Sequence, residues 1–179
     1  MKQVYLLTGR PGTGKTNLIK QAVAGMMGRA GGFYTEEIRG QGARKGFRLV
    51  TLDGKEAILA HIKIQSRYRV GKYGVDVDAL DRVGVVELKR AILQCRLVVV
   101  DEIGRMELFS DSFRETVLEI IDSGRWLLGT IMLDSNPWAD AIKRRPEVYL
   151  APVTGANNQH ALASLKQWLE GLDEGKADG

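Results

Sequence analysis

The sequence predicts a three-layer α/β domain, with helices on both faces of a mostly parallel sheet. Strand and helix patterns alternate at both ends of the chain, and residues 97–100 form a continuous apolar run of the kind buried in parallel sheets. Residues 32–62 have a different period, which indicates an antiparallel insertion. With 179 residues, 44% of them hydrophobic, the chain can bury the core of a single domain.

The chain begins with a strand, a loop and a helix. Residues 4–7 are apolar and predict a strand. A helix is expected from residue 15 to about residue 27, because apolar side chains recur there with helical spacing and glycines follow.

The insertion is expected to contain three short strands. Residues 33–38 and 47–52 look like strands joined by a basic, glycine-rich loop, and the Asp-Gly pair at 53–54 predicts a hairpin turn into a third strand at 57–62. These strands explain the change of period between residues 32 and 62.

The second half returns to alternating helices and strands. The expected elements are a helix from Asp76 or Asp78 to Gln94, a strand at 97–100, a helix at 110–121, a strand at 126–132, a helix at 137–145, a strand at 148–153 and a helix at 161–172. No linker composition separates them, so residues 1–172 are expected to form one domain. The polar segment 173–179 is expected to fray.

Residues 9–16 read Gly-Arg-Pro-Gly-Thr-Gly-Lys-Thr, a complete G-x-x-x-x-G-K-T phosphate-binding loop between a strand and a helix. Its glycines let backbone N–H groups converge on phosphate oxygens at the positive end of the helix. Lys15 is expected to reach the β- and γ-phosphates, and Thr16 to offer its hydroxyl to Mg²⁺. The expected nucleotide-binding residues are Gly9, Arg10, Pro11, Gly12, Thr13, Gly14, Lys15, Thr16 and Asn17.

An acidic pair follows the apolar strand at 97–100. Ligands of open α/β sheets bind outside the carboxyl ends of the strands, so Asp101 and Glu102 should meet the phosphate loop. Asp101 is expected to hold Mg²⁺ opposite Thr16, and Glu102 to orient and deprotonate a water molecule. The predicted catalytic residues are therefore Lys15 and Glu102.

A basic, glycine-containing segment could form a lid over the triphosphate. Arg67, Arg69 and Lys72 lie in it, and one of them could stabilise charge in the transition state as an arginine finger does. The alternative is a surface loop whose cations pair with nearby aspartates.

Two further segments contain candidate residues. Arg105 and Glu107 alternate with Met106 and Leu108, so we expect the charged pair to face the mouth of the site or solvent. Thr130 lies inside an apolar strand, either as a sensor of the γ-phosphate or as a hydrogen-bonded core threonine.

The composition favours a cytoplasmic protein that stays away from membranes. The longest apolar runs are only strand-sized, and the N-terminus shows no signal-type segment. The single cysteine, Cys95, is expected to be a packing residue. A net charge of +4 suits a nucleotide-binding protein without demanding nucleic acid as a partner, and we expect a monomer.

The chain resembles the small P-loop nucleoside-triphosphatases of the THEP type, called cancer-related nucleoside-triphosphatase in animals. The stretches that carry the resemblance are 9–16, Gly-Phe-Tyr-Thr-Glu-Glu-Ile-Arg at 32–39, Arg-Val-Gly-Lys-Tyr-Gly-Val-Asp at 69–76 and Asp-Glu-Ile-Gly-Arg-Met-Glu-Leu at 101–108. It implies Mg²⁺-dependent hydrolysis of ATP, GTP and other triphosphates with little base preference. It also implies a RecA-like sheet, in which one strand separates the phosphate-loop strand from the Asp-Glu strand. The family has a lysine where Arg105 stands and Asn-Arg where Asn157-Asn158 stands.

Two other functions fit the same residues. A phosphotransferase would use a nucleoside, a nucleotide or a polynucleotide 5′-hydroxyl as acceptor at the basic insertion, with Glu102 deprotonating that hydroxyl. A nucleotide-driven nucleic-acid-binding switch is less well supported, because aromatic and basic residues do not alternate as in a nucleic-acid platform.

Overall fold

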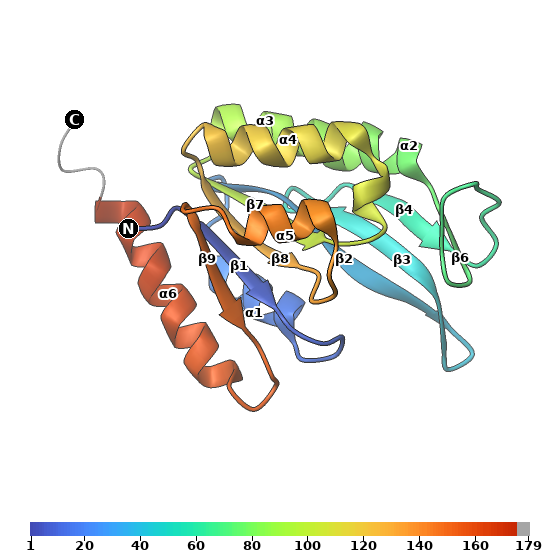
Figure 1. Cartoon of the computed structure of the whole chain (residues 1–179), viewed down its shortest axis with the longest axis horizontal. Helices are drawn as coiled ribbons and strands as arrows, with labels where there is room; N and C mark the ends of the chain where they lie inside the picture. Colours follow the sequence, from blue (N-terminus) through green and yellow to red (C-terminus); the bar gives the residue numbers. More distant parts are fainter. Residues whose placement is uncertain (175–179) are drawn as a thin grey trace.

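The computed structural model describes residues 1–174, which contain one nine-stranded sheet with helices on both faces (Figure 1). The strands are β1 (Val4–Thr8), β2 (Ala30–Gly40), β3 (Ala43–Thr51), β4 (Glu56–His61), β5 (Arg69–Val70), β6 (Tyr73–Val75), β7 (Leu97–Ile103), β8 (Trp126–Ile131) and β9 (Val148–Pro152). Their order across the sheet is β5-β6-β4-β3-β2-β7-β8-β1-β9.

One half of the sheet is parallel. In it, β2, β7, β8, β1 and β9 lie side by side and run in the same direction. Strand β8 separates β1, which precedes the phosphate loop, from β7, which contains Asp101 and Glu102. This confirms the RecA-like arrangement. Every side chain of β1 is buried, as expected for strands covered on both faces.

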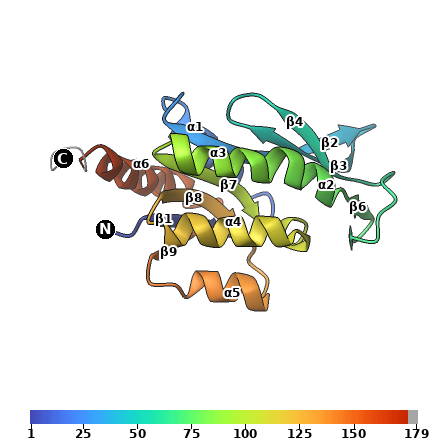
Figure 2. The same ribbon diagram turned by 90° about the horizontal axis from the view of Figure 1, so that it is seen from above.

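Helices cover both faces of the sheet (Figure 2). They are α1 (Lys15–Val23), α2 (Val77–Ala79), α3 (Val86–Gln94), α4 (Asp111–Asp122), α5 (Pro137–Lys143) and α6 (Asn158–Glu174). Helices α1 and α6 pack against one face through Ile19 and Leu165, and helices α3, α4 and α5 pack against the other through Leu88, Phe113 and Ile142. The three-layer α/β prediction is confirmed.

The antiparallel half begins at Phe33, inside β2 and within one residue of the expected start near residue 32. Residues 30–33 of β2 pair in parallel with β7, whereas residues 33–40 pair antiparallel with β3. Strands β4, β6 and β5 then continue the sheet, all in antiparallel pairs. One long strand therefore connects the two halves, and the antiparallel part continues to Val75, beyond the expected end near residue 62.

The prediction of a basic loop between residues 38 and 47 is wrong. Strands β2 and β3 continue through it to a tight turn at Gln41 and Gly42, where φ is 51° and 75°. Ion pairs between the two strands stabilise this extension. Glu36 pairs with Arg48 at 2.7 Å and Glu37 with Arg44 at 2.9 Å.

Several helix boundaries differ from the prediction. Helix α1 ends at Val23, four residues early, and α6 begins at Asn158, three residues early. The helix expected to reach Gln94 is a continuous helical run with a π-helical segment, Leu80–Val85, between α2 and α3. Gly84 lies in that segment, and a Cβ there would be only 2.8 Å from Leu49 Cδ1. Glycine thus lets the helix approach the sheet closely.

The C-terminal tail is shorter than expected. Helix α6 continues through Glu174, so residues 173 and 174 belong to it. The remaining expectation for the tail concerns residues 175–179, which lie outside the described residues. Within residues 1–174, no helix has both the length and the apolar character needed to cross a bilayer.

Candidate active site

The phosphate loop joins β1 to α1, as its sequence predicts. Gly12 and Gly14 have φ of 80° and 91°, values that residues other than glycine rarely adopt. A Cβ at Gly9 would lie 2.2 Å from the carbonyl oxygen of Val153, so the loop packs directly against the end of β9. The glycines are therefore required by the backbone path as well as by close approach to phosphate.

Hydrogen bonds hold the loop in place. The Lys15 Nζ donates to the carbonyl oxygens of Gly9 and Arg10 at 2.7 and 2.9 Å, which places the ammonium inside the curve of the loop. Thr13 Oγ1 donates to the Arg10 carbonyl at 2.9 Å. From the start of α6, Asn158 Nδ2 donates to the Thr13 carbonyl at 3.0 Å.

Asp101 connects the phosphate loop to the middle of the sheet. Its side chain is 2% exposed and accepts two hydrogen bonds of 2.6 Å, one from Thr16 Oγ1 and one from Thr130 Oγ1. Burial raises the pKa of Asp101, although the bonds from Thr130 and Thr16 act in the opposite direction. Thr130 thus orients Asp101, and the structure does not place it as a separate phosphate sensor.

Thr16 and Asp101 together suit a Mg²⁺ ion. Both provide hard oxygen atoms, and these atoms lie 2.6 Å apart beside the phosphate loop. No group of three or more His, Cys, Asp or Glu side chains in residues 1–174 could hold a metal alone. An ion here would therefore take its remaining ligands from phosphate oxygens and water, as Mg²⁺ usually does.

Glu102 faces the cavity that lies beyond the loop. Its Oε1 lies so close to Gly104 that a Cβ there would be 2.2 Å away. Burial raises the pKa of Glu102, as does the neighbouring charge of Asp101, while Lys15 lowers it. A raised pKa makes the carboxylate a better proton acceptor near neutral pH.

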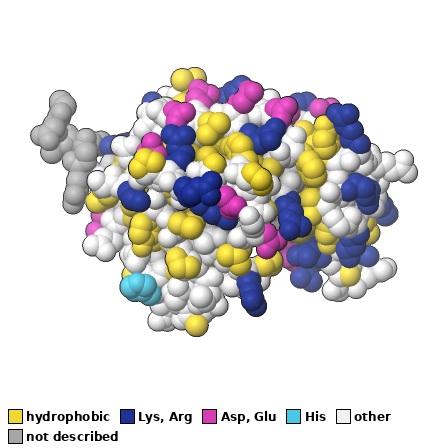
Figure 3. All heavy atoms as spheres, viewed as in Figure 1, with side chains coloured by type: hydrophobic (Ala, Val, Ile, Leu, Met, Phe, Trp, Pro, Cys, Tyr) yellow, Lys and Arg dark blue, Asp and Glu magenta, His cyan; other side chains and the backbone are white. Residues whose placement is uncertain are grey.

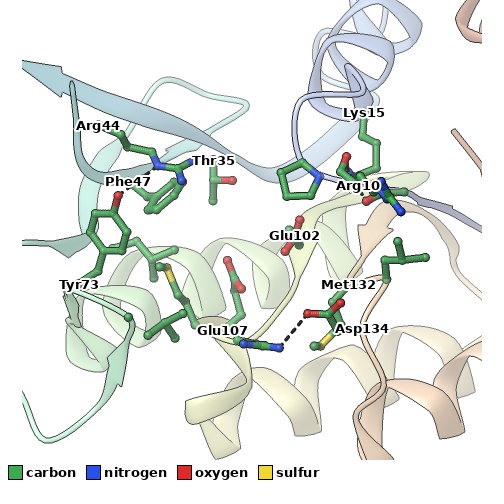
Figure 4. A pocket seen from close by; sticks show the side chains of 18 residues that line it. Arg10, Lys15, Thr35, Arg44, Phe47, Tyr73, Glu102, Glu107, Met132 and Asp134 are labelled. Atoms are coloured by element: carbon green, nitrogen blue, oxygen red, sulfur yellow. Dashed lines mark hydrogen bonds and ion pairs between the residues drawn. The ribbon is translucent and has the colours of Figure 1, made fainter. Parts of the chain in front are cut away.

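A cavity of about 740 Å³ extends from the phosphate loop to the antiparallel strands (Figure 4). Its loop end is formed by Gly9, Arg10, Pro11 and Lys15. Its far end is formed by Thr35, Arg44, Phe47, Leu59, Val70, Gly71 and Tyr73. Glu102 and Glu107 lie between these ends. Sequence reasoning did not assign the far wall, because its residues come together only through the pairing of β2, β3, β4 and β6. The available signal was the family resemblance, since Thr35 lies in the 32–39 stretch and Val70, Gly71 and Tyr73 lie in the 69–76 stretch.

Glu107 differs most from its expected position. It was expected to face the mouth of the site or solvent, but it is 4% exposed and its carboxylate points into the cavity (Figure 4). The alternating pattern fails because Glu107–Phe109 is a 3-10 helical turn, in which neighbouring side chains do not alternate between two faces. Its place in the 101–108 stretch of the family resemblance was the available signal.

The segment expected to form a lid reaches the cavity, but its three cations do not line it. Arg67 is exposed just before β5, and Arg69 and Lys72 are exposed on the hairpin of β5 and β6, whose Val70 and Gly71 line the cavity instead. Arg67 donates to the hydroxyl of the adjacent Tyr68 at 2.6 Å, and Arg69 donates to the Lys72 carbonyl at 3.0 Å. The alternative, an ion pair between one of these cations and a nearby aspartate, is also not found within residues 1–174.

Arg105 and Asn17 lie at two separate openings. Arg105 lines the cavity and forms an exposed 2.8 Å ion pair with Asp134. Asn17 lines a smaller pocket of about 210 Å³ between α1 and α6, together with Gly14, Asn158 and Gln159. The Asn158 Oδ1 atom is buried there without a hydrogen-bond partner in residues 1–174.

Comparison with known proteins identifies the family. A family model described as NTPase matches residues 4–165. A nucleoside-triphosphatase THEP1 of Thermotoga sp. strain RQ2 is 46% identical over 165 residues, covering 92% of this chain and 94% of that protein. The protein of the same name from Thermofilum pendens is 44% identical over 159 residues, covering 86% and 87%.

Two solved structures are similar throughout. The crystal structure of THEP1 from Aquifex aeolicus has a TM-score of 0.87 and 36% identity, covering 93% of this chain and 99% of that one. The solution structure of a human cancer-related nucleoside triphosphatase has a TM-score of 0.80 and 34% identity, covering 96% and 98%. With its phosphate loop, its buried Asp101 and a matching fold along nearly its whole length, the chain belongs to the THEP1 family of nucleoside-triphosphatases.

Proposed function

We propose that the protein hydrolyses nucleoside triphosphates to the diphosphate and phosphate, in a Mg²⁺-dependent reaction. The observation that carries this proposal is the chain of hydrogen bonds from Thr16 through Asp101 to Thr130, beside a phosphate loop and facing Glu102. The names of the relatives support the same reaction class.

Different residues bind the phosphates and the metal ion. Backbone N–H groups of the loop and the Lys15 ammonium bind the β- and γ-phosphates, which places the γ-phosphate toward Glu102. Thr16 and Asp101 would hold the metal ion, which would supply positive charge beside the phosphate oxygens. The hydroxyl of Thr130 keeps Asp101 in the orientation that this requires.

Glu102 acts as the general base. It orients a water molecule for in-line attack on the γ-phosphorus and accepts the proton that the water loses. Because both Glu102 and Lys15 line the same cavity, the attacking water lies on the γ-phosphate side of the loop. Most of the rate enhancement comes from positioning and charge stabilisation.

Low base selectivity fits the smaller pocket between α1 and α6. Its polar side chains include the amides of Asn17, Asn158 and Gln159. An amide offers both a donor and an acceptor and can match the edge of any base. The proposal therefore includes ATP and GTP as substrates, and it places the enzyme in the cytoplasm, where these nucleotides are abundant.

Phosphate release tests the proposal directly. The full chain is incubated with ATP, GTP, CTP or UTP in the presence of MgCl₂, and again with EDTA in excess. We expect steady release of phosphate from all four triphosphates, no release with EDTA and recovery when Mg²⁺ is restored, because Thr16 and Asp101 cannot neutralise the triphosphate without the ion. Equal release with and without Mg²⁺ would refute the metal assignment, and no release at all would refute the function.

A further inference from the structure

We propose that the far end of the large cavity binds a second substrate, a hydroxyl-bearing ring compound of nucleoside size, which accepts the γ-phosphoryl group in place of water. The inference rests on the proposed function, because the donor is the same triphosphate held by the phosphate loop. It adds an acceptor site, which hydrolysis alone does not need.

The cavity lies on the γ-phosphate side of the phosphate loop. Lys15 and Glu102 mark the γ-phosphate end of the loop, and the cavity continues from them to β3, β4 and β6. The nucleoside part of the donor would leave on the other side of the loop, where Asn17 and Asn158 line the smaller pocket. The far end therefore lies on the γ-phosphate side of the loop and is separate from the pocket for the donor's base.

The size of the cavity exceeds what a hydrolase needs. Its volume is about 740 Å³, within the range of about 300 to 1,000 Å³ found for small-molecule sites. A single water molecule occupies about 30 Å³. The triphosphate fills only the loop end, so the far end has room for a second molecule.

The far wall is chemically suited to a flat ring with polar groups at its edge. Phe47, Leu59 and Val70 line it with apolar surface, and the ring of Tyr73 meets that of Phe47 edge to face with centroids 5.4 Å apart. Arg44 adds a fixed cation. Its Nε donates to the Tyr73 hydroxyl at 3.1 Å and its guanidinium lies 5.1 Å from the centre of the Phe47 ring.

Glu107 indicates that this cavity favours a ligand with a hydrogen-bond donor. Its carboxylate is buried, points into the cavity and receives no hydrogen bond from another side chain of residues 1–174 (Figure 4). The backbone N–H groups of Glu107 and Gly104 offset part of the cost of burying this carboxylate, and a ligand that donates an O–H or N–H group would offset more. Hydrolysis of the triphosphate with Glu102 as the base gives Glu107 no role.

The transfer step balances without another reactant. The acceptor's hydroxyl oxygen forms a bond to the γ-phosphorus while the bond from that phosphorus to the β–γ bridging oxygen breaks. The hydroxyl proton passes to the Glu102 carboxylate, and the nucleoside diphosphate leaves with the bridging oxygen. The products are a phosphate monoester and a diphosphate.

The charges on the cavity wall favour a small molecule over a polynucleotide. Four cations line the cavity, namely Arg10, Lys15, Arg44 and Arg105, and three carboxylates oppose them, namely Glu102, Glu107 and Asp134. A groove that follows a polynucleotide backbone is uniformly positive. The mixed wall instead suits one ring with a few polar groups.

The test uses the full chain with Mg²⁺ and triphosphate labelled at the γ-phosphate. The probes are the four ribonucleosides, benzyl alcohol as a minimal ring alcohol, and an oligonucleotide with a free 5′-hydroxyl. We expect labelled monoester from at least one nucleoside or from benzyl alcohol, formed in place of labelled inorganic phosphate.

Matched variants locate the acceptor site. Arg44→Met and Arg39→Met each remove one cation that pairs with Glu37 at 2.9 Å, but only Arg44 lines the cavity. We expect Arg44→Met to raise the KM for the acceptor about tenfold or more, and Arg39→Met to leave it unchanged. Tyr73→Phe should also raise the KM for the acceptor. Melting curves show whether each variant is folded.

The outcomes separate this inference from the proposed function. Release of inorganic phosphate with no transfer to any probe would overturn the acceptor site and leave hydrolysis intact. Transfer only to the oligonucleotide, or equal effects of Arg44→Met and Arg39→Met, would also overturn it. Neither release nor transfer would instead overturn the proposed function.

Discussion

Glu102 faces a cavity in which a water molecule can approach the γ-phosphate, and its role can be tested alone. In Glu102→Gln the side chain keeps its shape but loses the ability to accept a proton. We expect phosphate release to fall about 10²- to 10⁴-fold, the usual contribution of a general base, while nucleotide binding is retained. Phosphate release and fluorescent-nucleotide binding are measured together.

Glu115→Gln is the control for this substitution, because Glu115 is exposed on α4. It removes the same charge from the chain and should leave phosphate release unchanged. If Glu102→Gln releases phosphate as fast as the parent protein, Glu102 is not the base.

Glu107 makes stability depend on pH. Burial is the main cause that raises the pKa of its carboxyl well above 4.5, followed by the charge of Glu102, whereas backbone N–H groups oppose the shift. The folded protein thus binds this proton more tightly than the unfolded chain does. The resulting stability is present below about pH 4.5 and is lost as the pH rises through the folded-state pKa.

Glu107→Gln removes this titration. We expect Glu107→Gln to gain stability relative to the parent protein as the pH rises from 4 to 8, because the parent loses the contribution of its bound proton over this range and the variant does not. Urea unfolding in EDTA at both pH values measures the difference. Glu37→Gln should shift in the opposite direction, because ion pairs with Arg44 and Arg39 lower the pKa of Glu37. A pH-independent difference for Glu107→Gln would contradict the assignment.

At the scale of elements, β2 joins the two halves of the sheet, and Gly32 makes this possible. Its φ is 117°, and a Cβ there would lie 2.0 Å from the carbonyl oxygen of Val99 in β7. Its N–H donates to the buried Glu87 at 3.1 Å, which ties α3 to the same strand. Glycine is therefore required where the parallel pairing with β7 changes to antiparallel pairing with β3.

Gly32→Ala should cost about 3 kcal/mol or more of the free energy of unfolding, because a strained φ and a backbone clash add together. Gly25→Ala is the control. Gly25 is exposed, has no positive φ, and a Cβ there meets nothing within 4 Å. Equilibrium urea unfolding compares the two, and equal stability of both variants would show that β2 tolerates a side chain at this point.

Element prediction succeeded where the pattern is local. The strand at 97–100 and the helix at 110–121 were expected within a few residues, because burial on both faces and the Ser110 cap are visible in the sequence. It failed at residues 39–46, where cross-strand ion pairs of Glu37 extend β2 and β3 through a segment rich in glycine and basic residues. Such pairs join residues that the sequence does not place together.

At the scale of the whole molecule, charge is unevenly distributed. Figure 3 shows Lys and Arg side chains gathered at the end of the molecule that carries the antiparallel strands. Large exposed hydrophobic side chains are instead spread over several elements, namely Met1, Met27, Ile58, Val86, Leu93, Leu133, Tyr149 and Leu150. Scattered apolar side chains are normal for a protein surface and do not form the core of a stable interface.

We therefore predict a monomer. The net charge of +4 also gives two copies the same sign and disfavours their association. Sedimentation velocity at rising protein concentration, at low salt and in excess Mg²⁺, should show one species with the mass of one chain. A shift toward twice that mass with concentration would contradict the prediction.

The sequence by itself determined the donor half of the site. A phosphate loop depends on consecutive residues, so Gly9 to Thr16 could be assigned from the order of the chain alone, and the apolar strand before Asp101 and Glu102 placed both at the same edge of the sheet. The tertiary structure decided everything that depends on pairing between distant strands. It brought Arg44, Phe47 and Tyr73 into one wall, because cross-strand register is set by side chains on separate segments. It also buried Glu107 facing that wall, through a helical turn that no alternating pattern could reveal.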